Sequence, residues 1–174
     1  ILLASALLGA TGVGAFDIVA GVRTAATIVI PVNVNLVEAF AADELQYHVA
    51  TATGAELPSR KESDADAGAT GLIFMGKTRR AALAGISAAE LPANAFHIRL
   101  WDGNLFFVGR DSRGRVIGAG GSGNSIHVNK TEMGTLFAVY EFLEAHLGVR
   151  WLWPGPEGEF VPAPAEGPPA ARMV

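Results

Sequence analysis

The sequence contains no cysteine, and only 17% of its 174 residues are charged. The absence of cysteine excludes a disulfide framework, a thiolate metal site and a cysteine nucleophile. Positive charge is also scarce, because 13 lysines and arginines stand against 17 acidic residues, for a net charge of −4. Such a chain lacks the basic surface that binds nucleic acid. Half of the residues are hydrophobic, which excludes a disordered chain and suits one domain with a core.

The motifs of common catalytic and metal sites are missing as well. No P-loop and no G-x-S-x-G elbow occurs, and the four histidines are too dispersed for a local metal motif. Glu44 and His48 share one predicted helix face, a spacing more typical of a surface contact than of a ligand set. Two close pairs of carboxylates, Asp43 with Glu44 and Glu157 with Glu159, are expected to be solvated. The sequence predicts no catalytic, metal or cofactor residues.

One glycine-rich segment matches the G-x-G-x-x-G pattern of dinucleotide sites, through Gly118, Gly120 and Gly123. In those sites the last glycine lies inside a helix whose N-terminus holds the pyrophosphate. Here the next helical pattern begins about ten residues too late, so the segment is interpreted as a surface loop. A dinucleotide site is therefore not predicted, and only observed NAD binding would support a nucleotide-dependent oxidoreductase.

The two ends of the chain differ in composition from its middle. Residues 1–15 are uncharged and either apolar or small, and they are short for a membrane span of about 20 residues. They resemble the apolar part of a secretory signal, with a small-residue cleavage site at residues 13–15, which predicts export to the periplasm, cell surface or exterior. A buried first strand or helix is the alternative. Residues 163–174 are rich in proline and alanine and predict a linker, which leaves 16–162 as the domain.

Two amphipathic helices are predicted within the domain, because apolar residues recur every three or four positions. Asn35 has the place of an N-cap, with Glu38 as its capping-box partner, and Gly54 ends that helix. The second helix runs from about Met133 to Leu147.

Short β-branched and apolar runs predict the strands, and Asp102-Gly103 predicts the turn of a hairpin. A short helix is expected over Arg79–Leu83, and the polar residues 58–70 predict a surface loop. Strands and helices alternate around one hairpin, which predicts an α/β fold with a mixed sheet. The predicted strands are 16–19, Thr27–Ile30, Leu72–Met75, Phe96–Trp101, 105–108, 149–153 and 159–161.

An aromatic run follows the second helix, with Arg150, Trp151 and Trp153 in the sequence RWLWPG. Two tryptophans two positions apart on a strand share a face. Such a face can stack on sugar rings or pack against a neighbouring domain, and packing is the commoner use.

Several separated segments together resemble a known type of domain. They are IVIP at 28–31, AADELQYHV at 41–49, TGAELP at 53–58, IFMG at 73–76 and, most specifically, GTLFAVYEFLEAHLGVRWLWPGPEGEFVP at 134–162. Together they resemble the N-terminal accessory domain before the catalytic barrel of bacterial carbohydrate-active proteins, as in α-glucuronidases and in the second domain of β-N-acetylhexosaminidases. The likeness covers about residues 16–162, and the glycine-rich insertion at 118–129 departs from it.

The resemblance implies a non-catalytic α/β layer, with the acid and base carboxylates in a barrel outside this sequence. It implies a parent glycosidase of the exported kind, and a domain that packs against the barrel. Arg150, Trp151 and Trp153 are then candidates for the domain interface or for the rim of a sugar site. The alternative is a stand-alone carbohydrate-binding or cell-surface interaction module.

Overall fold

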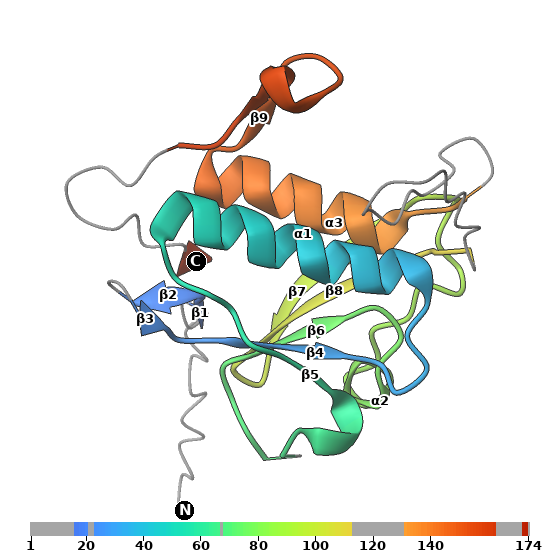
Figure 1. Ribbon diagram of the computed structural model, residues 1–174. Coiled ribbons are helices and arrows are strands. Elements are labelled where there is room, and N and C mark those ends of the chain that lie inside the picture. The colour runs from blue at the N-terminus through green and yellow to red at the C-terminus, as the bar shows by residue number, and fades with distance from the viewer. Residues whose placement is uncertain (1–15, 21–22, 67, 113–130, 163–171, 174) are drawn as a thin grey trace, which may run out of the picture.

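The computed structural model describes residues 16–20, 23–66, 68–112, 131–162 and 172–173. At its centre lies a five-stranded sheet in the order β5-β4-β6-β8-β7 (Figure 1). Its first four strands in that order are parallel to their neighbours, and β7 is antiparallel to β8, which confirms the predicted α/β fold with a mixed sheet. The five strands are β4 (Thr27–Ile30), β5 (Ser59–Lys61), β6 (Leu72–Met75), β7 (Phe96–Trp101) and β8 (Asn104–Gly109).

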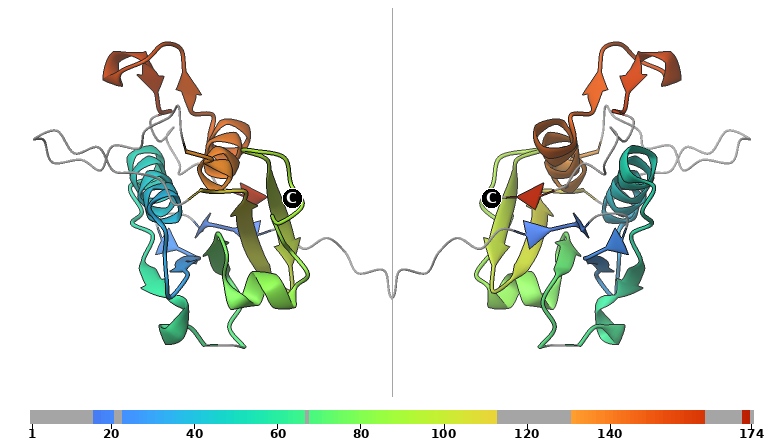
Figure 2. Two further views of the ribbon diagram at one scale, coloured as in Figure 1. Left: turned by 90° about the vertical axis from the view of Figure 1, so that its right-hand side faces the viewer. Right: turned by 90° about the vertical axis from the view of Figure 1, so that its left-hand side faces the viewer.

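Two long helices cover one face of the sheet, and a short helix lies on the other (Figures 1 and 2). They are α1 (Leu36–Thr53), α3 (Gly134–Phe142) with its π-helical continuation η3 (Leu143–Leu147), and the short α2 (Arg79–Leu83). The core divides accordingly, because alternate strand residues face the two sides. Ile73 and Phe107 pack beneath α1 and α3, whereas Phe74 and Phe106 stack on each other on the α2 side.

Smaller elements make up the rest of the regular structure in the described residues. Three two-stranded sheets pair β1 with β11, β2 with β3, and β9 with β10. Arg172–Met173, inside the segment predicted as a linker, form β11. The remaining bounds are β1 (Phe16–Asp17), β2 (Val19–Ala20), β3 (Arg23–Thr24), η1 (Glu62–Asp64), β9 (Arg150–Trp151), η4 (Pro156–Gly158) and β10 (Glu159–Phe160).

Local sequence signals account for the ends of α1. The Asn35 side chain accepts a hydrogen bond from the Glu38 amide, and the Glu38 carboxylate accepts one from the Asn35 amide, as the capping box requires. Gly54 ends the helix in the left-handed conformation, with φ of 75°. The hairpin is confirmed too, because Asp102 and Gly103 both have positive φ between β7 and β8.

The prediction of a surface loop over residues 58–70 is wrong for residues 59–64, although the described residues of the segment do lie at the surface. Ser59–Lys61 form β5, the edge strand beside β4, and Glu62–Asp64 form η1. All three side chains of β5 are exposed, so the strand has no apolar alternation by which it could be recognised. Its pairing with β4 rests on main-chain hydrogen bonds, with one added bond from the Arg60 side chain to the Thr27 hydroxyl, and neither is visible in a hydrophobicity pattern.

Within the described residues, no helix is both long and apolar enough to cross a membrane. The predicted secretory segment at 1–15 and the glycine motif at 118–123 lie outside the described residues.

Candidate functional site

The β9–β10 hairpin projects from the helical side of the domain, away from the sheet (Figure 1). Three large apolar side chains on it are open to solvent: Leu152 is 65% exposed, and Trp153 and Phe160 are each 55% exposed. A grouping of exposed apolar residues on one projecting element is typical of an interaction surface. These three residues are called the hairpin surface below.

The three predicted interface residues of the hairpin differ in exposure. Arg150 is exposed, and its guanidinium donates hydrogen bonds to the main-chain oxygens of Glu144 and Val149. Trp151 is half-buried, whereas Trp153 is exposed. The prediction that the two tryptophans share a strand face is wrong, because β9 ends at Trp151.

Beneath the hairpin lies a group of polar and aromatic side chains around His48. We call it the His48 cluster; its members are Glu44, His48, Tyr140, Trp151 and Glu159. The His48 side chain is fully buried, with Nε2 2.8 Å from Oε1 of Glu159 and Nδ1 2.7 Å from the main-chain oxygen of Glu44. Oε1 of Glu159 also accepts a hydrogen bond of 3.1 Å from the indole Nε1 of Trp151. The cluster therefore joins α1 to the hairpin.

Aromatic rings fill the space between the cluster's polar atoms. The Trp151 ring lies 5.4 Å from the His48 ring and 4.8 Å from the Tyr140 ring, measured between centroids. Tyr140 also shares a hydrogen bond with the Glu44 carboxylate. Burial raises the pKa of the Glu44 carboxyl group above its ordinary value, although His48 nearby lowers it. Burial and the neighbouring carboxylates raise the pKa of the Tyr140 hydroxyl as well.

The cluster corrects two predictions. Glu44 and His48 are not a surface pair, and Glu159 is not a solvated carboxylate, because one of its oxygens bonds to a buried histidine. The helical period did contain a signal for His48, which stands three positions after the buried Leu45 and four before the buried Ala52. Nothing in the sequence pairs it with Glu159.

A shallow groove of about 530 Å³ opens next to the cluster. Its walls combine aromatic rings from β7, α3 and β9 with two exposed carboxylates of the α3 segment. The lining residues are Phe96, Phe137, Tyr140, Glu141, Glu144 and Trp151. Aromatic faces beside carboxylates are a combination that can stack on and hydrogen-bond to a sugar.

The carboxyl ends of the parallel strands, where ligands bind in many α/β proteins, are closed by carboxylates of the chain itself. The Glu38 carboxylate accepts hydrogen bonds of 2.8 Å from the Asn35 amide and 2.9 Å from the Lys77 amide. At the start of α3, the Asp111 carboxylate accepts from the amide and hydroxyl of Thr135, at 2.8 and 2.6 Å. Burial raises the pKa of Asp111 to about 6, despite these bonds. Both helix starts thus hold an internal acid where an anion would bind.

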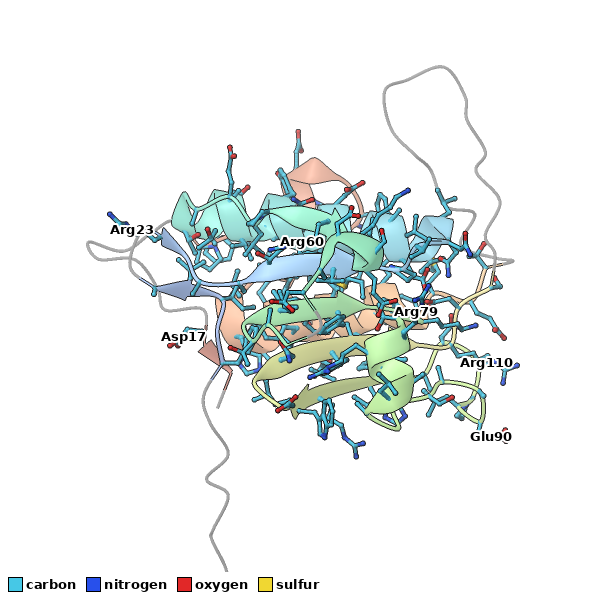
Figure 3. All side chains as sticks on the ribbon, turned by 90° about the horizontal axis from the view of Figure 1, so that it is seen from below. Asp17, Arg23, Arg60, Arg79, Glu90 and Arg110 are labelled. Atoms are coloured by element: carbon cyan, nitrogen blue, oxygen red, sulfur yellow. The ribbon has the colours of Figure 1, made fainter. Side chains whose placement is uncertain are left out.

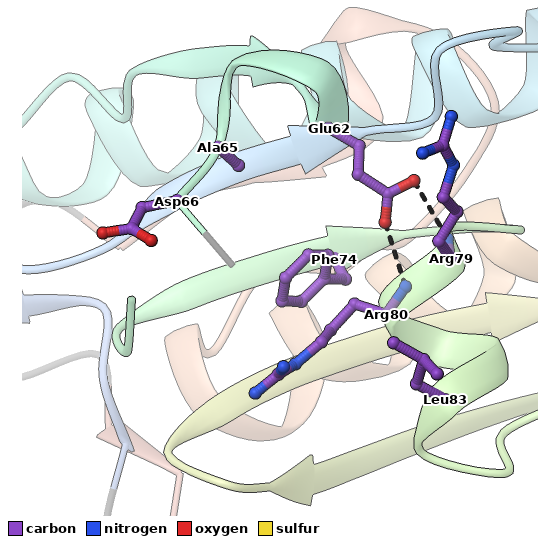
Figure 4. Close-up of a pocket in the computed structure, with 7 residues that line it drawn as sticks. All are labelled: Glu62, Ala65, Asp66, Phe74, Arg79, Arg80 and Leu83. Carbon is purple, nitrogen blue, oxygen red and sulfur yellow. Dashed lines mark hydrogen bonds between the residues drawn. The ribbon is translucent and has the colours of Figure 1, made fainter. Parts of the chain in front are cut away.

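In a pocket of about 210 Å³ on the α2 side, the polar side chains of Glu62 and Arg80 hold α2 in place (Figure 4). Its Glu62 carboxylate accepts hydrogen bonds from the Arg79 and Arg80 amides at the start of α2. The Arg80 guanidinium pairs with Asp102 and lies over the Trp101 ring. These bonds fix α2 against the sheet.

The charged residues Glu62, Asp66, Arg79 and Arg80 line that pocket, and Figure 3 shows the face with α2 on which it lies. Most charged side chains labelled there lie at the edges of the domain: Asp17, Arg23, Glu90 and Arg110. Across the part of the chain that the structure describes, no three histidine or acidic side chains are placed to hold a metal ion.

No protein-family model matches the chain, and no curated protein is detectably similar to it.

Proposed function

We propose that this chain is a non-catalytic accessory domain of an exported glycoside-hydrolase-like protein, and that its hairpin surface packs against a catalytic barrel of the same polypeptide. The carrying observation is the exposure of Leu152, Trp153 and Phe160 on a hairpin that is itself anchored from below. The sequence resemblance supplies the class of parent protein. The barrel would contribute the acid and base carboxylates of glycoside cleavage.

The anchoring matters because an interaction surface is effective when it is ordered before binding. A two-stranded hairpin is marginal by itself in water. Here the underside of the hairpin is tied to α1 by the bond between Glu159 and His48, and Trp151 packs on Tyr140. The apolar side chains are thereby presented on a supported element.

The test compares single substitutions in the full-length product of the gene. Burial of a tryptophan at an interface centre is often worth 2 kcal/mol or more, so Trp153→Ala should lower the thermal stability or the sugar turnover of that product. In the present chain alone the same change should leave the unfolding temperature nearly unchanged, since Trp153 is 55% exposed. Leu83→Ser is the matched control, because Leu83 is 77% exposed on α2, on the other face of the sheet.

The docking role is refuted if Trp153→Ala leaves both stability and turnover of the full-length product unchanged. The parent class is refuted if the coding sequence after Val174 encodes no strand–helix repeats with carboxylates at strand ends.

The groove favours a second candidate, a carbohydrate-binding module. Trp151 and Phe137 would stack on a sugar ring and Glu141 would accept hydrogen bonds from its hydroxyls. Calorimetric titration of the chain with N-acetylated and with uronic-acid-bearing oligosaccharides separates the two candidates. Heat of binding that disappears in Phe137→Ala, but not in Trp153→Ala, supports the module; absence of heat with both sugars refutes it.

A further inference from the structure

The contact between His48 and Glu159 requires a proton beyond the usual complement of the two side chains. Nδ1 of His48 lies 2.7 Å from the main-chain oxygen of Glu44, which can only accept, so Nδ1 bears a hydrogen. A neutral imidazole has just one N–H, and an ionised carboxylate has no donor. The 2.8 Å contact between Nε2 and the carboxylate of Glu159 therefore holds one further proton, on whichever of the two atoms it rests.

The surroundings of that proton are mostly acidic. The titratable and charged groups around it are Asp43, Glu44 and Tyr47 of α1, Tyr140 of α3, and Arg150 and Glu159 of the hairpin. Oε2 of Glu44 lies 3.9 Å from Nδ1. The Arg150 guanidinium is engaged by main-chain oxygens. A negative environment favours a proton held between the ring and the carboxylate.

The same contact is a tie between the hairpin and the body of the domain. The bond from Trp151 to Glu159 lies within the hairpin, because these two residues face each other across β9 and β10. The bond from Glu159 to His48 crosses to α1, and the Trp151 ring rests on Tyr140 of α3. Loss of the proton would remove the polar part of this tie and leave only the ring contacts.

We propose that the hydrogen bond between His48 and Glu159 is a proton-dependent latch, which holds the β9–β10 hairpin against the helices at mildly acidic pH and releases it outside that range. The latch concerns the regulation of the hairpin surface, so its biological role rests on the proposed function. The latch itself is a property of this chain alone.

The direction follows from counting protons in the two states. The closed pair holds one proton between ring and carboxylate. A solvated histidine and a solvated glutamate together hold none above about pH 6.5, one between about 4.3 and 6.5, and two below about 4.3. The hairpin therefore closes without taking up or releasing a proton only between about pH 4.3 and 6.5. Outside that range the equilibrium constant for closing falls by up to about tenfold per pH unit.

The test is nuclear magnetic resonance on the present chain between about pH 3 and pH 8. Cross-relaxation between the Trp151 and Tyr140 rings reports closure, and the nitrogen shifts of the His48 ring report the proton. We expect the ring contact to be strongest between about pH 4.3 and 6.5 and to weaken on both sides.

Two substitutions at one position make the result decisive. Glu159→Gln keeps an oxygen that accepts from both His48 and Trp151 but cannot take up a second proton, so the ring contact should stay strong below about pH 4.3 and weaken only above about pH 6.5. Glu159→Ala supplies no acceptor and should stay open at every pH. Glu157→Gln, on the same hairpin and exposed, is the matched control and should keep the wild-type profile.

A ring contact that is independent of pH in the wild type, or one that weakens below about pH 4.3 in Glu159→Gln as in the wild type, would overturn the latch. Because the measurement needs no partner, it stands whether or not the hairpin surface docks. Conversely, a Trp153→Ala defect in the full-length product together with a pH-independent hairpin would reject the latch and leave the docking role intact.

Discussion

Replacing Gly134 by alanine should destabilise the domain, because α3 begins in direct main-chain contact with β8. A Cβ at this position would lie 2.5 Å from the Ala95 oxygen, 2.6 Å from the Arg110 nitrogen and 2.9 Å from Cα of Gly109. All three are main-chain atoms, which cannot turn aside as a side chain can. The contact is reciprocal, since a Cβ on Gly109 would lie 2.0 Å from the carbonyl carbon of Gly134.

The expected loss is about 2 kcal/mol of unfolding free energy. Overpacking of a rigid site costs roughly 1–3 kcal/mol, and a helix regains up to about 1 kcal/mol when alanine replaces glycine. The upper half of the range applies here because the start of α3 must move away from β8. That movement also strains the bond of 3.0 Å from the Gly109 amide to the Thr135 hydroxyl.

The assay is urea unfolding followed by circular dichroism, with thermal unfolding beside it. For a domain of this size the loss corresponds to a fall of roughly 4–8 °C in the midpoint temperature. Gly68→Ala is the control, because its Cβ would meet only a carboxylate oxygen of Asp66, at 3.8 Å, and should change stability by less than about 0.5 kcal/mol. If Gly134→Ala unfolds at the same urea concentration as the wild type, the close packing of α3 on β8 is wrong.

Two further substitutions test the carboxylates at the helix starts. Glu38→Gln should lower the free energy of unfolding by about 1–3 kcal/mol, because the buried carboxylate accepts from the main-chain amides of Asn35 and Lys77 and a glutamine would turn an N–H toward one of them. The control in urea unfolding is Glu56→Gln, at an exposed position. Equal stability of the two variants would contradict the role of Glu38. Asp111→Asn tests pH dependence: its pKa of about 6 lies above the ordinary 3.8, so the folded state binds the proton more tightly. Wild-type stability should therefore fall, by up to about 3 kcal/mol, as pH rises from about 4 through 6. The variant should show a flatter profile in urea unfolding at stepped pH, and identical slopes would refute the raised pKa.

The parts of the fold that are predictable from sequence are those fixed by neighbours in the chain. The capping box of Asn35 with Glu38, the left-handed Gly54 and the turn at Asp102-Gly103 each depend on residues within three or four positions. Their backbone conformations are local choices, and tertiary packing leaves them unchanged. The sequence predicts one continuous helix from about Met133 to Leu147, whereas the structure has a π-helical segment over Leu143–Leu147, which is defined by its main-chain hydrogen bonds.

The parts that escaped prediction depend on distant pairing. β5 is held by main-chain hydrogen bonds to β4, and its exposed side chains have no apolar alternation that would predict that pairing. His48 and Glu159 are 111 positions apart. A glutamate in a turn rich in proline and glycine has the same local sequence whether its carboxylate meets water or a buried ring, so only the fold decides between them.

The arrangement of acids separates the two ends of the helical layer in a way that bears on function. At the N-terminal ends, Glu38 and Asp111 bond to main-chain and hydroxyl donors of the chain itself, so these carboxylates already serve the folded domain. Toward the C-terminal end of α1, the buried His48 bonds instead to Glu159 of a separate hairpin, and that hairpin presents Leu152 and Trp153 to solvent. Burying ionisable groups costs free energy. Here the buried pair holds in place the hairpin whose exposed apolar side chains a partner would contact. A domain of this design would respond to pH at its hairpin surface, whereas the carboxyl edge of its sheet would stay closed. We therefore expect a partner to bind at the hairpin and not at that edge.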